Sequence, residues 1–371
     1  MHGMAAIRTA DRYVVGTEPA FDFLSEEYRA LYRDSGASAF QAPLWLSMLH
    51  KQLMPELRAS QNTITIRSCM DGRLIAVFPF VVQISAGVSV IQPADFGVCD
   101  RNDIVAGAGA LEEFAADPAA LMQLRAATSK HDLLLFRKIW AGGFDVRRLF
   151  PHSRQKQAQN DAYVCDTGTD AEQWKQETLR KKFTKEMGRL QRKTEREIGL
   201  YEHRAVTDEN AIRAAFDFLR TVRHGRYGES LLDDRRYFDF YRDYAIAGAK
   251  CGEATTYVST IAGEPVAALF GLSGDGGYHA VLIGADIENH DHQSTGVQLL
   301  YRVIKMRIGD GHASFDMGLG DQGYKGHFRP NQIEVSNLTR AYSPTGAALA
   351  MIYHRSKPLK NFIKGILPNV R

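Results

Sequence analysis

Apolar and polar residues alternate along two stretches that lie far apart in the chain. The first, residues 64–82, turns at Gly72, and the second, which begins at Thr255, turns at Gly263. Alternation with a period of two around a glycine turn predicts a β-hairpin. Each hairpin is followed by another apolar run, GVSVIQP in the first case and GGYHAVLIGAD in the second, so a third strand is expected in each copy.

The two hairpins also match when Gly72 is aligned with Gly263, because Ala76 then falls on Ala267. A hairpin with a third strand, present twice, predicts two related α/β halves with mixed, mostly antiparallel sheets flanked by helices. Chance similarity is the alternative, because a single match supports the repeat. The polar run HSRQKQAQND places the boundary near residue 155, which gives halves 1–155 and 156–371.

Helical periodicity accounts for the segments around the hairpins. FDFLSEEYRALYRDSG and APLWLSMLHKQL precede the first hairpin, and TDENAIRAAFDFLRTVRHGRYG and DDRRYFDFYRDYAIAG precede the second. Residues 171–198 form one long helix-favouring stretch without proline. Its apolar residues recur at helical spacing, so one face should pack: Leu179, Phe183, Met187 and Leu190.

Composition fits a soluble globular protein of about two domains, since 371 residues include 44% hydrophobic and 24% charged residues. A net charge of +3 argues against general nucleic-acid binding, so any basic partner site must be local. The four cysteines form no CxxC pair or disulfide framework, which predicts reduced thiols in the cytoplasm. We expect no secretory signal at the start, and no membrane span in the broken apolar run from Leu74.

A helix is predicted over residues 297–308, starting at Ser294, Thr295 and Gly296. Glycine at a helix start lets a ligand approach free backbone N–H groups, and the helix dipole favours an anion there. The alternative is that Ser294 or Thr295 simply caps the helix.

The stretch FDMGLGDQGYKGHF, residues 315–328, concentrates four glycines and several reactive side chains. Asp316 alternates with apolar neighbours, so it points to the other face of its strand. The glycines permit a turn with positive φ angles, which would place Tyr324 and Lys325 over a cleft. The alternative is a structural ion pair between Asp316 and Lys325 with a packed Tyr324.

Histidines add one candidate. Because histidine as a residue type titrates near neutral pH, His279 in YHAVLIG is a candidate base, although a hydrogen-bonded core histidine is an at least equal alternative. His290 and His292 have no third ligand at a suitable spacing, so we predict no metal site.

The order hairpin, third strand, Gln-x-x-Gly-x, helix and strand resembles that of the GNAT acyltransferase superfamily. Its pyrophosphate loop reads Arg/Gln-x-x-Gly-x-Gly/Ala; Gln293-Ser-Thr-Gly296-Val matches the first five positions and Gln298 departs at the sixth. FDMGLGDQGYKGHF resembles the Phe-Asp-x-Gly-x-Gly-Asp-x-x-Tyr-Lys signature of the CelD-like acetyltransferases, relatives of the FemAB-like double-GNAT proteins. AFQAPLWL, ADFGVCDRND and LRKKFTKEMGRLQRK extend the resemblance over residues 40–328.

The resemblance implies two GNAT-like halves, with the donor site and catalytic site in the C-terminal one. It implies N-acyl transfer from an acyl thioester, either acyl-CoA or acyl carrier protein, to an amine, with no permanently bound cofactor. The expected residues form a catalytic and a donor-binding group: Asp316, Tyr324 and His279 for catalysis, and Gln293, Ser294, Thr295, Gly296 and Lys325 for the donor.

Two basic segments suggest where the acceptor is found. Residues 179–196 carry eight Lys or Arg against two Glu, and the C-terminal run SKPLKNFIKGILPNVR forms an amphipathic stripe with lysines beside it. Such helices bind anionic membrane surfaces or acidic carrier proteins, although a solvated face over a packed stripe is the simpler alternative. Together they predict a cytoplasmic protein, peripheral on the inner membrane, with a lipid amine as acceptor and no nucleic-acid partner.

The chain is in this respect similar to bacterial ceramide synthases, so the predicted acceptor is a sphingoid base. Acylation of an amino sugar for an exopolysaccharide is the alternative implied by the CelD-like group. Aminoacyl transfer from tRNA, as in FemAB-type proteins, is disfavoured because the helix 171–198 shows no return partner for a coiled-coil arm. A non-catalytic GNAT-fold scaffold is the remaining alternative, since no pyrophosphate-type loop follows GVSVIQP.

Overall fold

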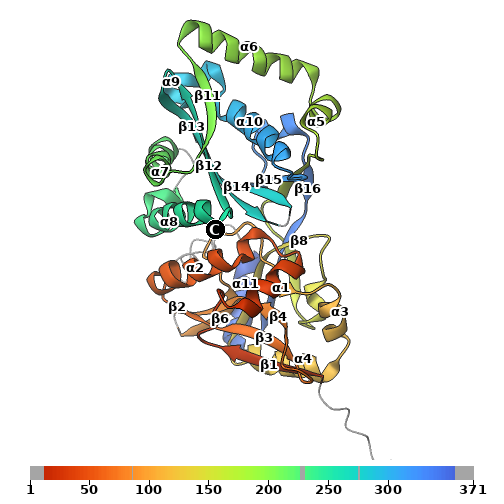
Figure 1. The fold of residues 1–371 in the computed structure, drawn as a ribbon. Helices are drawn as coiled ribbons and strands as arrows, with labels where there is room; N and C mark the ends of the chain where they lie inside the picture. The colour runs from red at the N-terminus through yellow and green to blue at the C-terminus, as the bar shows by residue number, and fades with distance from the viewer. Residues whose placement is uncertain (1–11, 86, 226–229, 275, 356–371) are drawn as a thin grey trace, which may run out of the picture. The chain divides into compact units, whose positions relative to one another are not determined.

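The computed structural model describes residues 12–85, 87–225, 230–274 and 276–355 (Figure 1). The basic C-terminal run that was predicted to form an amphipathic helix lies outside these residues. The described chain folds as two compact units: unit 1 contains residues 12–37, 57–156 and 336–355, and unit 2 contains residues 38–56 and 157–335.

The units therefore differ from the predicted sequence halves 1–155 and 156–371. The chain passes from unit 1 to unit 2 next to residue 156, but residues 38–56 belong to unit 2 and residues 336–355 to unit 1. Apolar burial explains the first exchange. Trp45 is fully buried, and its ring centroid lies 5.0 Å from that of Phe240 and 4.7 Å from that of Tyr244.

Unit 1 contains two sheets. The four-stranded antiparallel sheet has the order β1-β3-β4-β7 and comprises β1 (Tyr13–Glu18), β3 (Thr63–Ser68), β4 (Leu74–Phe78) and β7 (Val105–Ala106). The six-stranded sheet has the order β2-β5-β6-β8-β17-β9 and comprises β2 (Ala59–Gln61), β5 (Phe80–Ser85), β6 (Val88–Pro93), β8 (Leu133–Trp140), β17 (Val335–Ala341) and β9 (Arg154–Gln157). Its helices are α1 (Glu26–Ser35), α3 (Ala110–Ala115), α4 (Pro118–Thr128) and α11 (Pro344–Arg355), with a 3₁₀ turn η2 (Val146–Arg148).

Unit 2 contains one seven-stranded sheet. Its order is β11-β12-β13-β14-β15-β10-β16, with β11 (Tyr201–Val206), β12 (Ala254–Ile261), β13 (Glu264–Gly274), β14 (Gly277–Ala285), β15 (Ser314–Leu319), β10 (Ala162–Asp166) and β16 (Asn331–Ile333). The helices are α2 (Pro43–Glu56), α5 (Ala171–Thr178), α6 (Lys181–Glu197), α7 (Glu209–Arg223), α8 (Arg235–Cys251), α9 (Ile287–His290) and α10 (Thr295–Gly309). Short 3₁₀ segments are η1 (Ala39–Gln41), η3 (Leu231–Asp233), η4 (Asp291–Gln293) and η5 (Gly323–Phe328).

Helices cover both faces of this sheet (Figure 1). At the end of β14, a Cβ placed on Gly284 would meet Val222 of α7, whereas Ala285 lies against Gly296 of α10. Because successive strand residues point to opposite faces, α7 and α10 cover opposite faces of the sheet. The predicted α/β architecture with mixed sheets and flanking helices is thus confirmed.

Both predicted hairpins are present. The strands β3 and β4 turn at Gly72, the strands β12 and β13 turn at Gly263, and both glycines have positive φ angles. The third strands are β6 and β14. In unit 1, Pro79 lies between β4 and β5, and these two strands belong to different sheets. Proline has no backbone N–H to donate, so it does not continue the hydrogen bonding of a strand.

The helix predicted over residues 171–198 is divided into α5 and α6, with Leu179 and Arg180 in extended conformation between them. The predicted apolar face is buried as expected: Leu179, Phe183, Met187 and Leu190 join the core of unit 2.

Arg307 fixes α10 to the sheet. Its Nε donates to the Tyr257 hydroxyl at 2.5 Å, and its guanidinium carbon lies 4.9 Å from the ring centroid of Tyr278. A charge held against buried aromatic rings and hydroxyls permits little rotation of the helix. The start of α10 is therefore held in a defined place above the end of β14.

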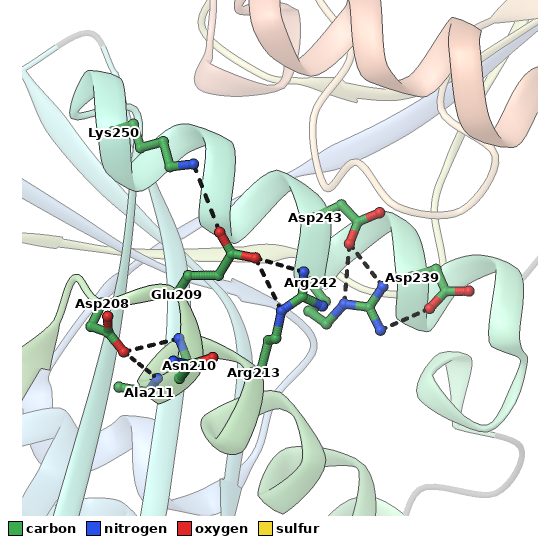
Figure 2. Close-up of polar contacts among 9 residues, drawn as sticks. All are labelled: Asp208, Glu209, Asn210, Ala211, Arg213, Asp239, Arg242, Asp243 and Lys250. Carbon is green, nitrogen blue, oxygen red and sulfur yellow. Dashed lines mark hydrogen bonds and ion pairs between the residues drawn. The ribbon is translucent and has the colours of Figure 1, made fainter.

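Ion pairs lie on the surface of the helices α7 and α8, and one of them, between Glu209 and Lys250, joins the two helices (Figure 2). Glu209 binds Arg213 at 2.8 Å on α7 and approaches Lys250 of α8 at 3.8 Å, while Asp208 accepts hydrogen bonds from the first N–H groups of α7. Exposed pairs of this kind contribute about 0–1 kcal/mol each. The apolar contacts of the helices with the sheet therefore dominate their stability.

We expect Gly271→Ala to destabilise unit 2. A Cβ on Gly271 would lie 2.4 Å from the carbonyl oxygen of His279 and 2.4 Å from the ring of Tyr278. That ring is fully buried and its hydroxyl donates to the Thr255 carbonyl oxygen at 3.0 Å, so it cannot turn away. Overpacking should cost about 1–3 kcal/mol, measured as a lower melting temperature by calorimetry.

The control is Gly309→Ala at the end of α10, where a Cβ meets nothing within 4 Å. This change should leave the melting temperature equal or slightly higher, because alanine favours a helix. Equal melting temperatures for both variants would contradict the packing around Gly271.

Candidate functional site

The site begins where two parallel strands separate. β14 and β15 pair over three positions only, Gly277 with Ser314, Tyr278 with Phe315, and His279 with Asp316. Beyond this point β14 continues to Ala285 without β15 at its side. A bulge in its pairing with β13 follows directly, since Ala280 and Leu282 face consecutive residues of β13. Bulges redirect side chains and end pairing, and they are frequent next to active sites.

His279 and Asp316 occupy this point of separation. The His279 Nδ1 atom lies 3.0 Å from Asp316 Oδ2, and the two residues are 8% and 4% exposed. The other carboxylate oxygen, Oδ1, accepts the N–H of Gly318 at 2.8 Å. A carboxylate at Nδ1 selects the tautomer that carries the proton there, which leaves Nε2 as the basic nitrogen. The pair is therefore suited to accept a proton from a reacting group.

Phe40 packs against this histidine. Its ring centroid lies 5.7 Å from that of the His279 imidazole, with the planes at 63°. Phe40 belongs to η1, in the segment that unit 2 receives from the N-terminal part of the chain. An edge-on aromatic contact restricts the imidazole to one orientation.

The pKa of the Cys165 thiol is affected by burial and by the charge of Asp316. Burial and, to a smaller extent, the negative charge of Asp316 raise the pKa of this thiol to about 12, against the opposing charge of Lys325. Its sulfur lies 3.5 Å from that of Met317. The thiol is therefore neutral at physiological pH and serves as a packing group.

The turn after β15 has the predicted glycine conformation. Gly318 and Gly320 have φ angles of 76° and 83°, a region that other residues rarely adopt. Lys325 closes this turn from the inside, because its Nζ donates to the carbonyl oxygens of Gly318 at 2.9 Å, Leu319 at 3.3 Å and Gly320 at 2.8 Å.

Lys325 was expected among the donor-binding residues, and the structure gives it backbone partners in its own turn. The residue is 1% exposed, and a buried ammonium group requires all of its hydrogens to be bonded. Its contacts with three backbone oxygens meet that requirement. In this arrangement Lys325 shapes the loop that carries Tyr324.

The start of α10 lacks a side-chain cap. Ser294 is the N-cap residue with φ 49° and ψ 43°, and neither its hydroxyl nor another side chain caps the helix. The Thr295 hydroxyl donates instead to the Val266 carbonyl oxygen at 3.4 Å. The alternative that these two hydroxyls simply cap α10 is therefore wrong, and the first-turn N–H groups remain available to an anion.

Gln298, the residue that departs from the loop pattern, has a structural contact. It is 1% exposed, and its Nε2 donates to the Gln293 carbonyl oxygen at 2.7 Å. The long side chain thus folds back and holds the loop from below. Gln293, which was expected to bind the donor, holds this side chain through its carbonyl oxygen and is not among the residues that line the cavity between β14 and α10.

A cavity of about 490 Å³ lies between the end of β14 and the start of α10. Its walls are the strand residues 283–285, the helix start 294–297, Ile287, Asp291 and Tyr324. Gly296 allows strand and helix to approach, because a Cβ on it would lie 3.2 Å from the Cβ of Ala285. We call this space the donor cavity. It combines the N–H groups of the first turn of α10, the part of β14 beyond its pairing with β15, and a phenol.

The structure thus groups the predicted residues in three places. Ser294, Thr295, Gly296 and Tyr324 line the donor cavity. His279 and Asp316 form the pair at the end of the parallel pairing, and His279 precedes the cavity residues on β14. His290 and His292 lie in α9 and η4, and the described residues contain no group of three metal-binding side chains.

Several residues of the site were missed. The strand residues 283–285 form one wall of the donor cavity, and Phe40 positions His279. The small residues in LIGAD could have indicated close approach of another element at that strand end. No pattern within a single segment indicates that Phe40 lies beside a histidine more than 200 positions later.

Comparisons with known proteins agree with this geometry. Residues 181–326 match the family described as acetyltransferase (GNAT) domain, from α6 to η5. No curated protein matches the sequence significantly. The described helices include none that is long and apolar enough to cross a membrane.

Solved structures show the fold of the whole chain. FemX is 10% identical, with 92% of this chain and 100% of that chain covered and a TM-score of 0.65. The L-PGS of Bacillus licheniformis is 15% identical, with 94% and 98% covered and a TM-score of 0.55. The C-terminal domain of a putative lysylphosphatidylglycerol synthetase from Agrobacterium fabrum is 14% identical, with 93% and 97% covered and a TM-score of 0.55. These likenesses show that the chain shares its fold with the three proteins, and the acetyltransferase (GNAT) domain model matches a part of unit 2.

We expect two of the four cysteines to react with Ellman's reagent in the native protein. Cys69 and Cys251 are exposed, whereas Cys99 and Cys165 are buried, and thiolate is the reactive form. Denaturation should release all four. Peptide mass mapping after alkylation identifies the sites, and labelling of Cys165 as fast as Cys69 would contradict its burial next to Asp316.

Proposed function

We propose that unit 2 transfers an acyl group from acyl-CoA, or a related acyl thioester, to an amine and so forms an amide. The observation that carries this proposal is the His279–Asp316 pair, at 3.0 Å, on the strand that leads into the donor cavity. The GNAT domain match supports the reaction type.

The donor would bind along the free edge of β14. Its pyrophosphate would accept hydrogen bonds from the backbone N–H groups at the start of α10, where Thr295 and Gly296 lie. The helix dipole favours negative charge there. The donor's pantetheine arm would then run along the side of β14 that no longer pairs with β15, from residues 283–285 toward His279. An extended arm that hydrogen-bonds a strand edge adds to the sheet in the manner of a further strand.

In the proposed reaction the amine nitrogen attacks the thioester carbonyl carbon. His279 Nε2 takes the amine proton while Asp316 stabilises the resulting imidazolium. A C–N bond forms, the C–S bond breaks, and the Tyr324 phenol gives its proton to the leaving thiolate. The products are an amide and a free thiol, and the proton returns from His279 to Tyr324 through solvent.

For the acceptor we propose a long-chain amine, with a sphingoid base as the first compound to assay. This choice rests on the basic amphipathic C-terminal run, which lies outside the described residues, and on the basic helix α6. An amino sugar is the second compound. A protein that binds no acyl thioester at all would instead be a scaffold with this fold.

The proposed roles of His279, Asp316 and Tyr324 can be tested with one variant each. We expect His279→Ala to lower kcat by about 10²–10⁴-fold, and Asp316→Asn and Tyr324→Phe by at least about tenfold, because general acid–base groups contribute at this level. Release of CoA thiol from hexadecanoyl-CoA, with a sphingoid base or glucosamine as acceptor, measures the rate.

His152→Asn is the control, because this exposed histidine of unit 1 has a positive φ angle that asparagine tolerates. It should retain full turnover. If folded His279→Ala also retained full turnover, His279 would not be the base.

Donor binding can be tested without turnover. Gly296→Val adds a branched side chain where even a Cβ would lie 3.2 Å from Ala285, so it should separate helix and strand. We expect the Kd for CoA in isothermal titration calorimetry to rise at least about tenfold, as a helix start displaced from its ligand loses hydrogen bonds. Gly309→Ala is again the control, and equal affinities would place the donor elsewhere.

A further inference from the structure

A second cavity, of about 690 Å³, runs along α6 and opens beside the donor cavity. The two share Asp291, Ser294 and Val297, so the start of α10 borders both. We call this second space the α6 groove. A ligand that fills it would lie next to whatever binds at the helix start.

The α6 groove has an apolar floor and a basic rim. Phe183, Met187 and Leu190 form the floor and are 7%, 6% and 8% exposed. The rim is formed by exposed cations of α6 that also line the groove: Arg180, Lys182, Arg189 and Lys193. Two carboxylates, Glu186 and Asp291, are the only acidic groups among the described lining residues. The groove is therefore electropositive.

Two of the rim cations are available to a partner. Arg189 is bound by Glu186 at 2.6 Å, and Lys193 lies 3.7 Å from Glu197. The side chains of Arg180 and Lys182, in contrast, make no hydrogen bond and no ion pair within 4 Å in the described part of the chain, although the charge of Lys182 helps to lower the pKa of Glu186. They stand at the end of α6 that precedes the apolar floor, and His327 stacks on Phe183 beside them at 4.9 Å.

We propose that the α6 groove docks an acidic helix of an acyl carrier protein, which presents its acyl-phosphopantetheine arm to the donor cavity. This inference rests on the proposed acyl transfer and specifies its donor. The single phosphate of the arm would lie at the start of α10, and the arm would enter the donor cavity from the shared border. Acidic side chains of the partner helix would face the rim while its apolar side covers the floor.

The shape of the groove favours this partner. The rim extends from residue 180 to residue 193, which spans about 20 Å along a helix at 1.5 Å per residue. A helix of a partner protein needs such a length, whereas a single phosphate group needs only two or three donors. A membrane surface is flat and would contact exposed cations on every side of α6, but it would not fill a cavity behind them.

The experiment compares two donors with the same acyl chain, hexadecanoyl carrier protein and hexadecanoyl-CoA. The variant Arg180→Glu with Lys182→Glu reverses two free rim charges. Lys185→Glu with Arg192→Glu is the matched control, because it makes the same charge change on the same helix at residues that do not line the groove. Both variants are first compared with the native protein by circular dichroism.

We expect the rim variant to raise KM for the carrier-protein donor at least about tenfold more than KM for the CoA donor, with increasing salt reducing the difference. The control should change the two KM values in the same proportion. Titration of the rim variant with holo carrier protein should show the same loss of affinity without turnover.

Other outcomes overturn the proposal and remain distinct from failure of acyl transfer itself. Equal increases of both KM values would assign the groove to the nucleotide of CoA. Equal effects of rim and control variants, accompanied by loss of binding to phosphatidylglycerol vesicles, would assign α6 to a membrane surface. Use of hexadecanoyl-CoA with no use of the carrier protein would refute the docking and leave the proposed function in place. Absence of transfer from both donors would refute the proposed function.

Discussion

The short parallel pairing of β14 and β15 is the constraint on which the site depends. The two strands share three paired positions and then separate, so backbone groups of β14 lose their neighbour inside the sheet. Unpaired strand groups have to find other partners, and a strand edge of this kind is a template for an extended ligand. His279 and Asp316 occupy the last paired position before the strands separate. Beyond this position lies the cavity that α10 and Tyr324 border. The position of the His279–Asp316 pair and that of the cavity thus both depend on the point where β14 and β15 stop pairing.

Unit 1 also contains a short parallel pairing of strands, and a buried ion pair follows it. β6 and β8 also pair in parallel, through Val90 with Leu133 and Ile91 with Leu134. Asp95, directly after β6, is fully buried and contacts the Arg137 guanidinium of β8 at 2.5 Å. Burial alone would raise the pKa of Asp95, but Arg137 and Lys138 hold it below its usual value.

A buried ion pair of this kind is strongly destabilised when one partner is removed, so it fixes the interior of unit 1. In unit 2 the parallel strands β14 and β15 carry a histidine and a carboxylate, on the strand that leads to the donor cavity. The parallel strands of unit 1 are thus followed by a buried ion pair, whereas those of unit 2 hold a pair that is suited to proton transfer. This difference is why we assign the chemistry to unit 2.

The sequence predicted elements well where local chemistry determines them. Glycine turns gave both hairpins, periodic apolar residues gave the buried face of α6, and the glycine-rich stretch gave the turn after β15. It predicted His279 and Asp316 separately, because their contact depends on the register of two strands 37 residues apart. It assigned Lys325 to a ligand, because nothing in the sequence indicates that an ammonium group will meet three carbonyl oxygens of its own turn. It also placed α2 with the wrong half, because an amphipathic pattern shows that a face is buried and not which surface covers it.

That exchange determines what the functional unit is. Phe40, which restrains His279, and Trp45, which packs on α8, come from the N-terminal part of the sequence, ahead of all strands of unit 1 except β1. Residues 336–355 return to unit 1 after the last strand of the unit 2 sheet. A division of the sequence at residue 155 would therefore remove Phe40 from its contact with the His279 imidazole and Trp45 from its contact with α8. The proposed site therefore needs residues from both ends of the sequence of unit 2, because that unit includes residues 38–56 as well as 157–335.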